Sequence, residues 1–248
     1  MPTHAETQAA KESDWSTLST RLVAAVKPSA RPVAITFLDE EPTIPRRDAP
    51  AAPPNEHGRT GQVPAGCVFW MLGSDDTFAT TAADHANCSV GSLTHGFLSL
   101  EEAATKDDVG AVLESGWVDE ASVRDLPRVQ AKPAAVVYGP LADCTNPPDV
   151  VLLRINGLGL MTIADAVPSL RIEGKPQCHI VAIAKEQGSV AASVGCALSR
   201  SRTGMNAEEM TCAIPGPRLA EVVDAVEAAV ALDRAVATYA SHDARRFG

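Results

Sequence analysis

Two runs, VVLLRI at residues 150–155 and AAVVY at residues 134–138, decide the fold of this chain. Both runs are apolar, rich in β-branched residues and of strand length. Such runs are typical of strands covered on both faces, because a strand with one face in water alternates apolar and polar residues instead. We therefore predict two buried strands in a sheet that has other elements packed on each side.

The segments around these strands predict the rest of the framework. PVAITFL at residues 32–38 alternates and predicts a third strand. Ser13 or Asp14 is a good N-cap for a helix that runs to Lys27, and the apolar stripe in residues 219–239 predicts a long C-terminal helix. With no internal repeat and no second core, the pattern predicts a single α+β domain over residues 14–248, in which helices flank a mixed β-sheet.

A hairpin is predicted from two further alternating runs, residues 178–184 and 189–195, joined by the turn KEQG at 185–188. Pairing residue 184 with 189 places Cys178 within one residue of facing Cys196. Opposed residues in such a ladder have Cα atoms roughly 4.5–5.5 Å apart. This geometry would also allow a disulfide between the two cysteines. Cys212 is expected in a short segment at the edge of the sheet.

Two segments have little predicted structure. Residues 1–13 are polar and are expected to be a flexible N-terminus. Residues 39–65 contain six prolines and almost no apolar periodicity, and a structureless stretch of this length is uncommon inside a compact domain. We interpret it as a lid, because it leads straight into Cys67, and a tolerated surface insertion is the alternative.

Charge and composition exclude some functions. The net charge is −10, which argues against binding to nucleic acid or to an anionic membrane surface. No apolar run has transmembrane length and the N-terminus does not resemble a secretory signal, so we expect a cytoplasmic protein. In that compartment, six cysteines are expected to be thiols, metal ligands or catalytic groups rather than structural disulfides.

The residues with the most chemistry lie in GCVFWMLGSDDTFATTAADHANCSVGSLTHGF at residues 66–97. If residues 84–97 form one helix, His85, Cys88, Ser92 and His95 share a face, with spacings of three, seven and ten residues. An imidazole, a thiol, a hydroxyl and a second imidazole on one face need a metal, a substrate or a buried polar network to satisfy them.

Four cysteines are expected to gather at one site: Cys67, Cys88, Cys178 and Cys196. Thiolate ligands select zinc, copper(I) or an iron–sulfur centre, although no CxxC pair is present. Arg200 and Arg202 follow Cys196 closely and would suit an anionic substrate or lower the pKa of a thiol. Cys144 and Cys212 are interpreted as small core or turn residues.

Each candidate also has a purely structural interpretation. A free cysteine is often only a small buried hydrophobic residue. His85 could belong to the first turn of a helix, and His95 could be a histidine favoured by the negative end of a helix dipole. The turn NGLG at residues 156–159 could bind a phosphate, but tight packing is the favoured interpretation.

The elements CVFW, DHANCSVGSLTHGF, PPDVVLL, VGCALSRSRTG and MTCAIP resemble the prokaryotic family catalogued as domain of unknown function 169. The resemblance extends from about Pro32 to Val230. It implies that the family's characteristic cysteines match Cys67, Cys88, Cys178 and Cys196. The pattern DHxNCxxGxxTHG, which adds His85 and His95, resembles one branch of that family. The resemblance implies no particular activity.

Three functions remain open from the sequence. The first is an iron–sulfur or related thiolate–metal enzyme that acts on a small anionic molecule, by reductive chemistry or by removing a sulfur or halogen group, with a possible electron donor as partner. In that hypothesis His85, His95 and Arg200 have catalytic roles. The second is a haem- or zinc-binding carrier or sensor, in which Phe69, Trp70 and Phe97 would line a haem pocket. The third is metal-free catalysis with Cys88 as nucleophile and His85 as its base.

Overall fold

The computed structural model describes residues 14–44 and 65–247, with only the backbone of residues 242–247. The predicted flexible start at residues 1–13 and most of the predicted lid, residues 45–64, lie outside the described residues. Both interpretations therefore stay predictions.

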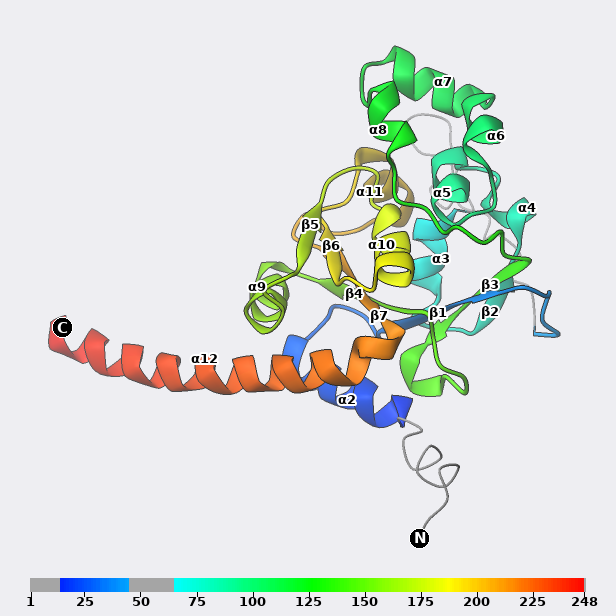
Figure 1. Cartoon of the computed structure of the whole chain (residues 1–248). Helices are drawn as coiled ribbons and strands as arrows, with labels where there is room; N and C mark the ends of the chain where they lie inside the picture. The colour runs from blue at the N-terminus through cyan, green and yellow to red at the C-terminus, as the bar shows by residue number, and fades with distance from the viewer. Residues whose placement is uncertain (1–13, 45–64, 248) are drawn as a thin grey trace, which may run out of the picture.

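A seven-stranded mixed sheet forms the centre of a single α+β domain (Figure 1), as the sequence predicted. The order across the sheet is β2-β3-β1-β4-β7-β6-β5, and every neighbouring pair is antiparallel except β5 and β6, which are parallel. The strands are β1 Val33–Leu38, β2 Phe78–Thr80, β3 Ala135–Pro140, β4 Val150–Ile155, β5 Arg171–Glu173, β6 Ala191–Ser193 and β7 Met210–Pro215.

The central strands are buried on both faces, because alternate residues enter two separate cores. Ala34, Val151 and Leu153 belong to one core, and Ile35 and Leu152 belong to the other. We call the side of Leu153 the first face of the sheet and the side of Leu152 the second face. The strand predicted from VVLLRI is thereby confirmed as β4, buried on both faces, and AAVVY is confirmed as part of strand β3, whose Val136 and Tyr138 enter the core on the second face.

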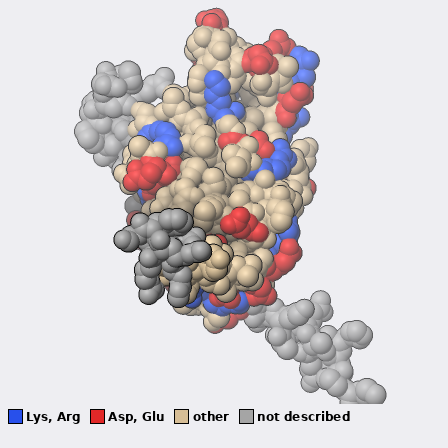
Figure 2. All heavy atoms as spheres, turned by 90° about the vertical axis from the view of Figure 1, so that its left-hand side faces the viewer, with Lys and Arg blue, Asp and Glu red and all other residues tan. Residues whose placement is uncertain are grey.

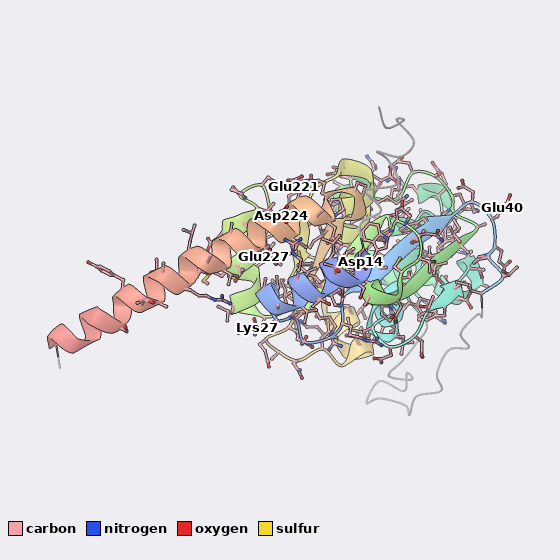
Figure 3. The ribbon with its side chains drawn as sticks, turned by 90° about the horizontal axis from the view of Figure 1, so that it is seen from below. Asp14, Lys27, Glu40, Glu221, Asp224 and Glu227 are labelled. Atoms are coloured by element: carbon pink, nitrogen blue, oxygen red, sulfur yellow. The ribbon has the colours of Figure 1, made fainter. Side chains whose placement is uncertain are left out.

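Three helices cover the first face: α2 Trp15–Val26, α9 Gly157–Ala166 and α12 Leu219–Phe247. Asp14 caps α2 by accepting from the amide of Ser16 at 3.1 Å. Helices α2 and α12 lie side by side (Figure 3), and Arg21 on α2 forms ion pairs with Asp224 and Glu227 on α12. These contacts hold the first and the last described helix together on the same side of the sheet.

Helices α3 and α10 cover the second face, and six shorter or peripheral helices pack around and above them (Figure 1). The bounds on this side are α3 Gly66–Leu72, α4 Ala82–His85, α5 Ser89–Thr94, α6 Leu100–Ala104, α7 Asp107–Glu114, α8 Glu120–Arg124, α10 His179–Gln187 and α11 Ala197–Thr203.

The predicted hairpin is wrong. Residues 179–187 form helix α10, and only Ala191–Ser193 of the second run is a strand, β6. All six residues from His179 to Ala184 are buried, because α10 lies between the sheet and α5. A short segment buried on all sides has no polar face, so its sequence does not distinguish helix from strand. Strand β7, which carries Cys212, lies inside the sheet between β4 and β6 rather than at its edge.

The last turns of α12 extend beyond the body of the protein (Figure 1). On this part the side chains of Leu232, Val236 and Tyr239 are exposed. Among the described residues, no helix combines the length and the apolar character needed to cross a membrane. On the face in Figure 2, basic and acidic side chains are interspersed rather than gathered into one basic patch.

Candidate functional site

The four cysteines singled out from the sequence line one pocket of about 360 Å³ on the second face. Cys67 comes from α3, Cys88 directly precedes α5, Cys178 directly precedes α10 and Cys196 directly precedes α11. All four are free thiols. Cys178 and Cys196 therefore meet through two helices rather than through the predicted hairpin.

Each of these cysteines lies at a helix N-terminus. Cys88, Cys178 and Cys196 occupy N-cap positions, and Cys67 is in the first turn of α3. The Cys196 sulfur accepts from the amide of Ser199 at 3.4 Å, as an N-cap serine hydroxyl would. A helix N-terminus carries about half a positive charge, so the pocket is surrounded by groups that favour negative charge.

The helix is interrupted between His85 and Ser89, so the predicted single helix over residues 84–97 is wrong. Helix α4 ends at His85, Cys88 is extended with φ −145°, and α5 begins at Ser89. The Ser92 hydroxyl donates to the carbonyl of His85 at 2.8 Å. This break directs Cys88 to the pocket and leaves the two imidazoles in the core.

His85 and His95 are fully buried and do not line the pocket. Their ring centroids lie 5.2 Å apart, and His85 Nε2 lies 3.0 Å from the Thr80 hydroxyl. Burial lowers the pKa of His95 to about 4, partly opposed by the carbonyl of Gly91. Burial, and secondarily His95, lowers the pKa of His85 well below its usual value. Both rings are therefore neutral near pH 7.

Gly66 explains how the two buried histidines, His85 and His95, which we call the histidine layer, contact the wall of the pocket. A Cβ atom at this position would lie 2.8 Å from Cε1 of His95. The imidazole thus packs directly against the backbone behind Cys67, and the wall of the pocket rests on the histidines. His95 supports the site without reaching into it.

Arg200 and Arg202 differ sharply, although both are on α11. The Arg200 guanidinium donates to the backbone carbonyls of Val194, Asn206 and Glu209 and does not line the pocket. Arg202 is only 9% exposed and lines the pocket. Burial opposes its charge, yet its pKa is raised because Cys88 accepts from it and Cys67 and Cys196 lie near. The structure thus assigns to Arg202 the position in the pocket that was expected of Arg200.

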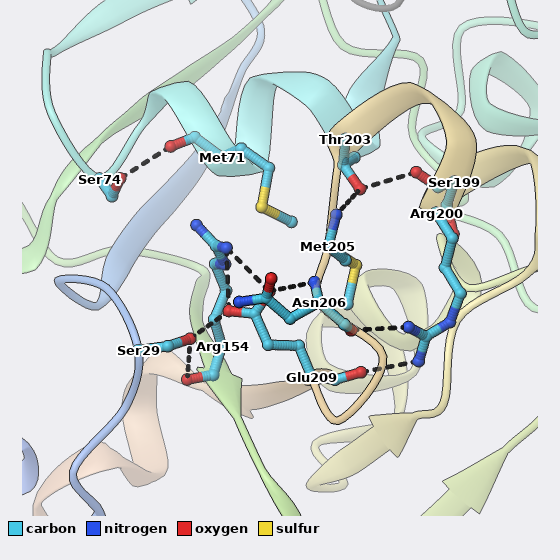
Figure 4. Close-up of polar contacts among 10 residues, drawn as sticks. All are labelled: Ser29, Met71, Ser74, Arg154, Ser199, Arg200, Thr203, Met205, Asn206 and Glu209. Atoms are coloured by element: carbon cyan, nitrogen blue, oxygen red, sulfur yellow. Dashed lines mark hydrogen bonds and ion pairs between the residues drawn. The ribbon is translucent and has the colours of Figure 1, made fainter.

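Arg200 instead fixes the loop that follows α11 (Figure 4). In the same network Glu209, 2% exposed, forms an ion pair with Arg154 at 2.9 Å and accepts from the amide of Asn206 and the hydroxyl of Ser29. Because these contacts join β4 and β7 to the loop, they hold α11, and with it Cys196 and Arg202, against the sheet.

The pattern of this chain matches one known family over most of its length. A family model, domain of unknown function 169, described as "Uncharacterised ArCR", matches residues 21–225. The chain belongs to this family. No curated protein and no solved structure matches it.

Gln177 is a pocket residue that sequence reasoning missed in this family member. Its side chain is 1% exposed, and its Oε1 accepts from the Ser199 hydroxyl at 3.2 Å. Gly195, with φ +87°, is needed beside it because a Cβ atom there would lie 3.0 Å from Oε1. Its position next to Cys178 in the sequence was the one available signal.

Most of the remaining wall of the pocket is apolar. Val112 comes from α7 and Trp117 from the segment after it, and Lys175 lies over the Trp117 ring at 4.7 Å. The aromatic residues expected around a haem are elsewhere: Phe69, Trp70 and Phe97 are each at most 1% exposed in the core. They stabilise the histidine layer and leave no face for a macrocycle.

Other singled-out residues lie away from the pocket. Cys212 is fully buried in the first-face core, and the Cys144 thiol donates to the carbonyl of Asn146 at 2.9 Å. In the NGLG turn, Asn156 caps α9, and a Cβ at Gly159 would lie 3.2 Å from Val26. The turn is used for packing on the first face.

The four cysteine sulfurs that line the pocket are ligands of the kind that soft metal centres prefer. Four thiols are the ligand set of common iron–sulfur clusters. Among the side chains that the structure describes, no three His, Cys, Asp or Glu lie together as they would around a single ion. A tetrahedral zinc site needs sulfurs within about 4 Å of each other. A 4Fe–4S cluster needs wider spacing, because each thiolate binds a different iron.

Proposed function

We propose that this protein is a cytoplasmic enzyme that binds an iron–sulfur centre through Cys67, Cys88, Cys178 and Cys196 and acts on a small anionic molecule. One observation carries the proposal: four helix N-termini, each with a cysteine, line a single pocket with a buried arginine. Reducing conditions in the cytoplasm would keep all six cysteines as free thiols.

The electrostatics of the pocket support an anionic centre. A cluster held by four thiolates carries net negative charge, which is costly to bury unless it is compensated. The helix N-termini and the Arg202 guanidinium supply that compensation. In this respect the pocket differs from an ordinary core that contains small buried cysteines.

Metal binding would have to displace protons. Burial, with Cys88 and Cys196 adding to it, raises the pKa of Cys67 to about 12, and burial raises the pKa of Cys178 as well. Without a metal both groups are neutral thiols at pH 7. Affinity for iron or zinc is therefore expected to rise with pH, because ligation requires the thiolate form.

The chain's own residues define what the site could do. Arg202 would hold an anionic group, and the apolar wall with Trp117 would exclude water from the reacting atoms. When bound, an iron–sulfur centre would supply electrons or an iron that acts as a Lewis acid. Reductive chemistry, or removal of a sulfur or halogen group, fits this combination, with a separate electron donor as partner.

A second candidate function is metal-free catalysis by Cys88. It is favoured by the place of Cys88 in the same pocket as Arg202, the one cation among the described residues that line it. His85, the base predicted for this reaction, does not line the pocket, and neither does His95, because both are enclosed in the core.

The test is anaerobic purification followed by visible absorption and assays of iron, zinc and acid-labile sulfide. Single Cys→Ser variants at the four pocket positions are compared with Cys212→Ser, which also removes a buried thiol but on the first face. We expect iron, sulfide and broad visible absorbance in the wild type and in Cys212→Ser. Each pocket variant should lose most of them.

Two results would overturn the cluster. A colourless, metal-free protein in which only Cys88 is essential for thiol reactivity would favour the nucleophile. Equal loss of iron in Cys212→Ser and in the pocket variants would mean that general destabilisation, rather than ligation, explains the loss.

A further inference from the structure

Two residues that line the pocket each carry a buried hydrogen-bond donor without a partner among the residues that the structure describes. These donors are Nε of Arg202 and the amide nitrogen Nε2 of Gln177. Arg202 is 9% exposed and Gln177 is 1% exposed, so water does not freely satisfy them. Buried polar atoms nearly always have a partner, and two orphaned donors in one pocket indicate that a ligand supplies the acceptor.

Both side chains are fixed by neighbouring atoms. The Gln177 Oε1 accepts from the Ser199 hydroxyl at 3.2 Å, which leaves its nitrogen free. Arg202 Nη2 donates to the carbonyl of Asn87 at 3.4 Å. Ser199 and Arg202 are one turn apart on α11. The two free donors are therefore held in place before any ligand arrives, which lowers the entropic cost of binding.

The charge around the donors limits the ligand to a single negative charge. Arg202 is the one cation among the described residues that line the pocket. Asp108 also lines it, and its carboxylate accepts from the amide of Ser89 at 2.9 Å. With one guanidinium and one carboxylate in its lining, the pocket without a metal centre would attract a monoanion and disfavour a dianion such as phosphate.

The rest of the pocket calls for an apolar body. The apolar residues of its wall include Val90 from α5, Ala111 and Val112 from α7, Trp117 after α7, and Leu198 from α11. A volume of about 360 Å³ lies within the range of small-molecule sites. The ligand must therefore combine an anionic end with a hydrophobic body of modest size.

We propose that Arg202 and Gln177 form a carboxylate subsite, and that the pocket takes a monocarboxylate with an aromatic or aliphatic body. A guanidinium edge matches the planar geometry of a carboxylate, and the Gln177 amide donates to the same group or to its second oxygen. This inference names the substrate class for the proposed function and rests on it for the reaction. Binding itself depends only on the two donors and the apolar wall.

The test is calorimetric titration of the full chain with benzoate, in anaerobic samples with and without bound metal. Benzamide has the same shape without charge, acetate has the charge without the body, and inorganic phosphate is the dianion. We expect benzoate to bind at least about tenfold more tightly than each of the three, because charged hydrogen bonds and apolar burial act together. Quenching of Trp117 fluorescence, absent in Trp117→Phe, would place the probe in this pocket.

Variants then assign the donors. Arg202→Met should weaken benzoate binding between about tenfold and a hundredfold and leave benzamide binding within about twofold. Gln177→Glu, which is isosteric but places a carboxylate at the subsite, should also abolish selectivity for benzoate. Arg124→Met removes an exposed arginine on α8, where its side chain is 64% exposed, and should change nothing.

Benzamide binding as tightly as benzoate, or unchanged benzoate binding in Arg202→Met, would overturn the subsite. Tighter binding of phosphate than of benzoate would do the same. If Arg202→Met does not fold, Gln177→Glu decides. The two proposals can be contradicted separately. Selective benzoate binding without iron or sulfide would overturn only the proposed cluster. Bound iron and sulfide without benzoate selectivity would overturn only the proposed carboxylate subsite.

Discussion

The two faces of the sheet are built from adjacent residues of the same strands, yet they differ in kind. The first-face core is apolar, and Cys212 is its one fully buried cysteine among the described residues. On the second face, Trp70, His85, His95 and Gln177 each carry a buried polar atom without a partner, whereas no described side chain of the first-face core does. The first face stabilises the fold. The second face leaves buried polar atoms without hydrogen-bond partners among the described residues, which is the cost of forming a site there.

Adjacent leucines test this division with the largest expected effect. Leu153 lies in the first-face core and Leu152 in the second, and each is at most 1% exposed. Replacing either with Ala should lower the free energy of unfolding by about 2–5 kcal/mol, because each leaves a cavity. Urea unfolding measures the loss.

The same pair shows whether the faces are independent. In folded protein, Leu153→Ala should leave the rates at which the pocket thiols react with a maleimide unchanged, and Leu152→Ala should raise them. Altered thiol reactivity in Leu153→Ala would mean that the first face also sets the geometry of the pocket.

Acid should destabilise the second face through its histidines. The pKa of His95 is about 4 in the fold, because burial lowers it, and its ordinary value is 6.5. Below pH 6.5 the unfolded chain binds a proton that the folded chain does not, so stability is complete above pH 6.5 and falls toward pH 4. His95 alone should account for up to about 3 kcal/mol over this range.

The comparison that isolates this effect is wild type against His95→Gln, unfolded by urea at several pH values between 4 and 7.5. Carboxylates elsewhere titrate equally in both proteins and cancel in the difference. Parallel pH profiles would show that His95 is not buried as a neutral ring, and the description of the histidine layer would fail.

The close packing of the histidine layer against the pocket predicts a coupled pair. Gly66→Ala should cost about 1–3 kcal/mol, because its Cβ would lie 2.8 Å from Cε1 of His95. In the double variant with His95→Ala, the cost of the alanine at 66 should fall by at least about 0.5 kcal/mol, since the obstructing ring is gone. Additive costs in a double-mutant cycle would contradict the contact.

The smallest effect concerns the first face. Asn156→Ala removes the side chain that accepts from the amide of Gly159 at 3.0 Å and caps α9. It should cost about 1 kcal/mol by thermal or urea unfolding, and Asn156→Asp, which keeps the cap, much less. Neither change should affect iron content or benzoate binding. A loss of either would bring the NGLG turn back as a functional element.

The sequence predicted the first face far better than the second, and periodicity explains why. Helices α2 and α12 have a water-facing side, so their apolar stripes are visible in the sequence, and β4 was predicted to the residue. Helix α10 has no such side and was predicted as a strand. The break before Cys88 depends on tertiary contacts such as the one between Ser92 and His85.

For the site, the sequence pointed to all four pocket cysteines but gave the catalytic role to Arg200, whereas Arg202 is the arginine that lines the pocket. Residues three apart lie on the same side of a helix, so Arg202 shares the side of Ser199, which lines the pocket. The burial of His85 and His95 could not be derived, because one unbroken helix would have placed them beside Cys88. No sequence motif pointed to Gln177.

The positions of the four cysteines in the chain also set an order of events in the cell. Cys178 follows Cys88 by ninety positions (178 − 88), and Arg202 is later still. While the ribosome is still making the second half of the chain, Cys67 and Cys88 lack the two later cysteines that line the pocket with them. The pocket is complete only after α11 and β7 have joined the sheet. It therefore forms late in synthesis, and a chain truncated before Cys178 would carry two of its four cysteines and no complete pocket.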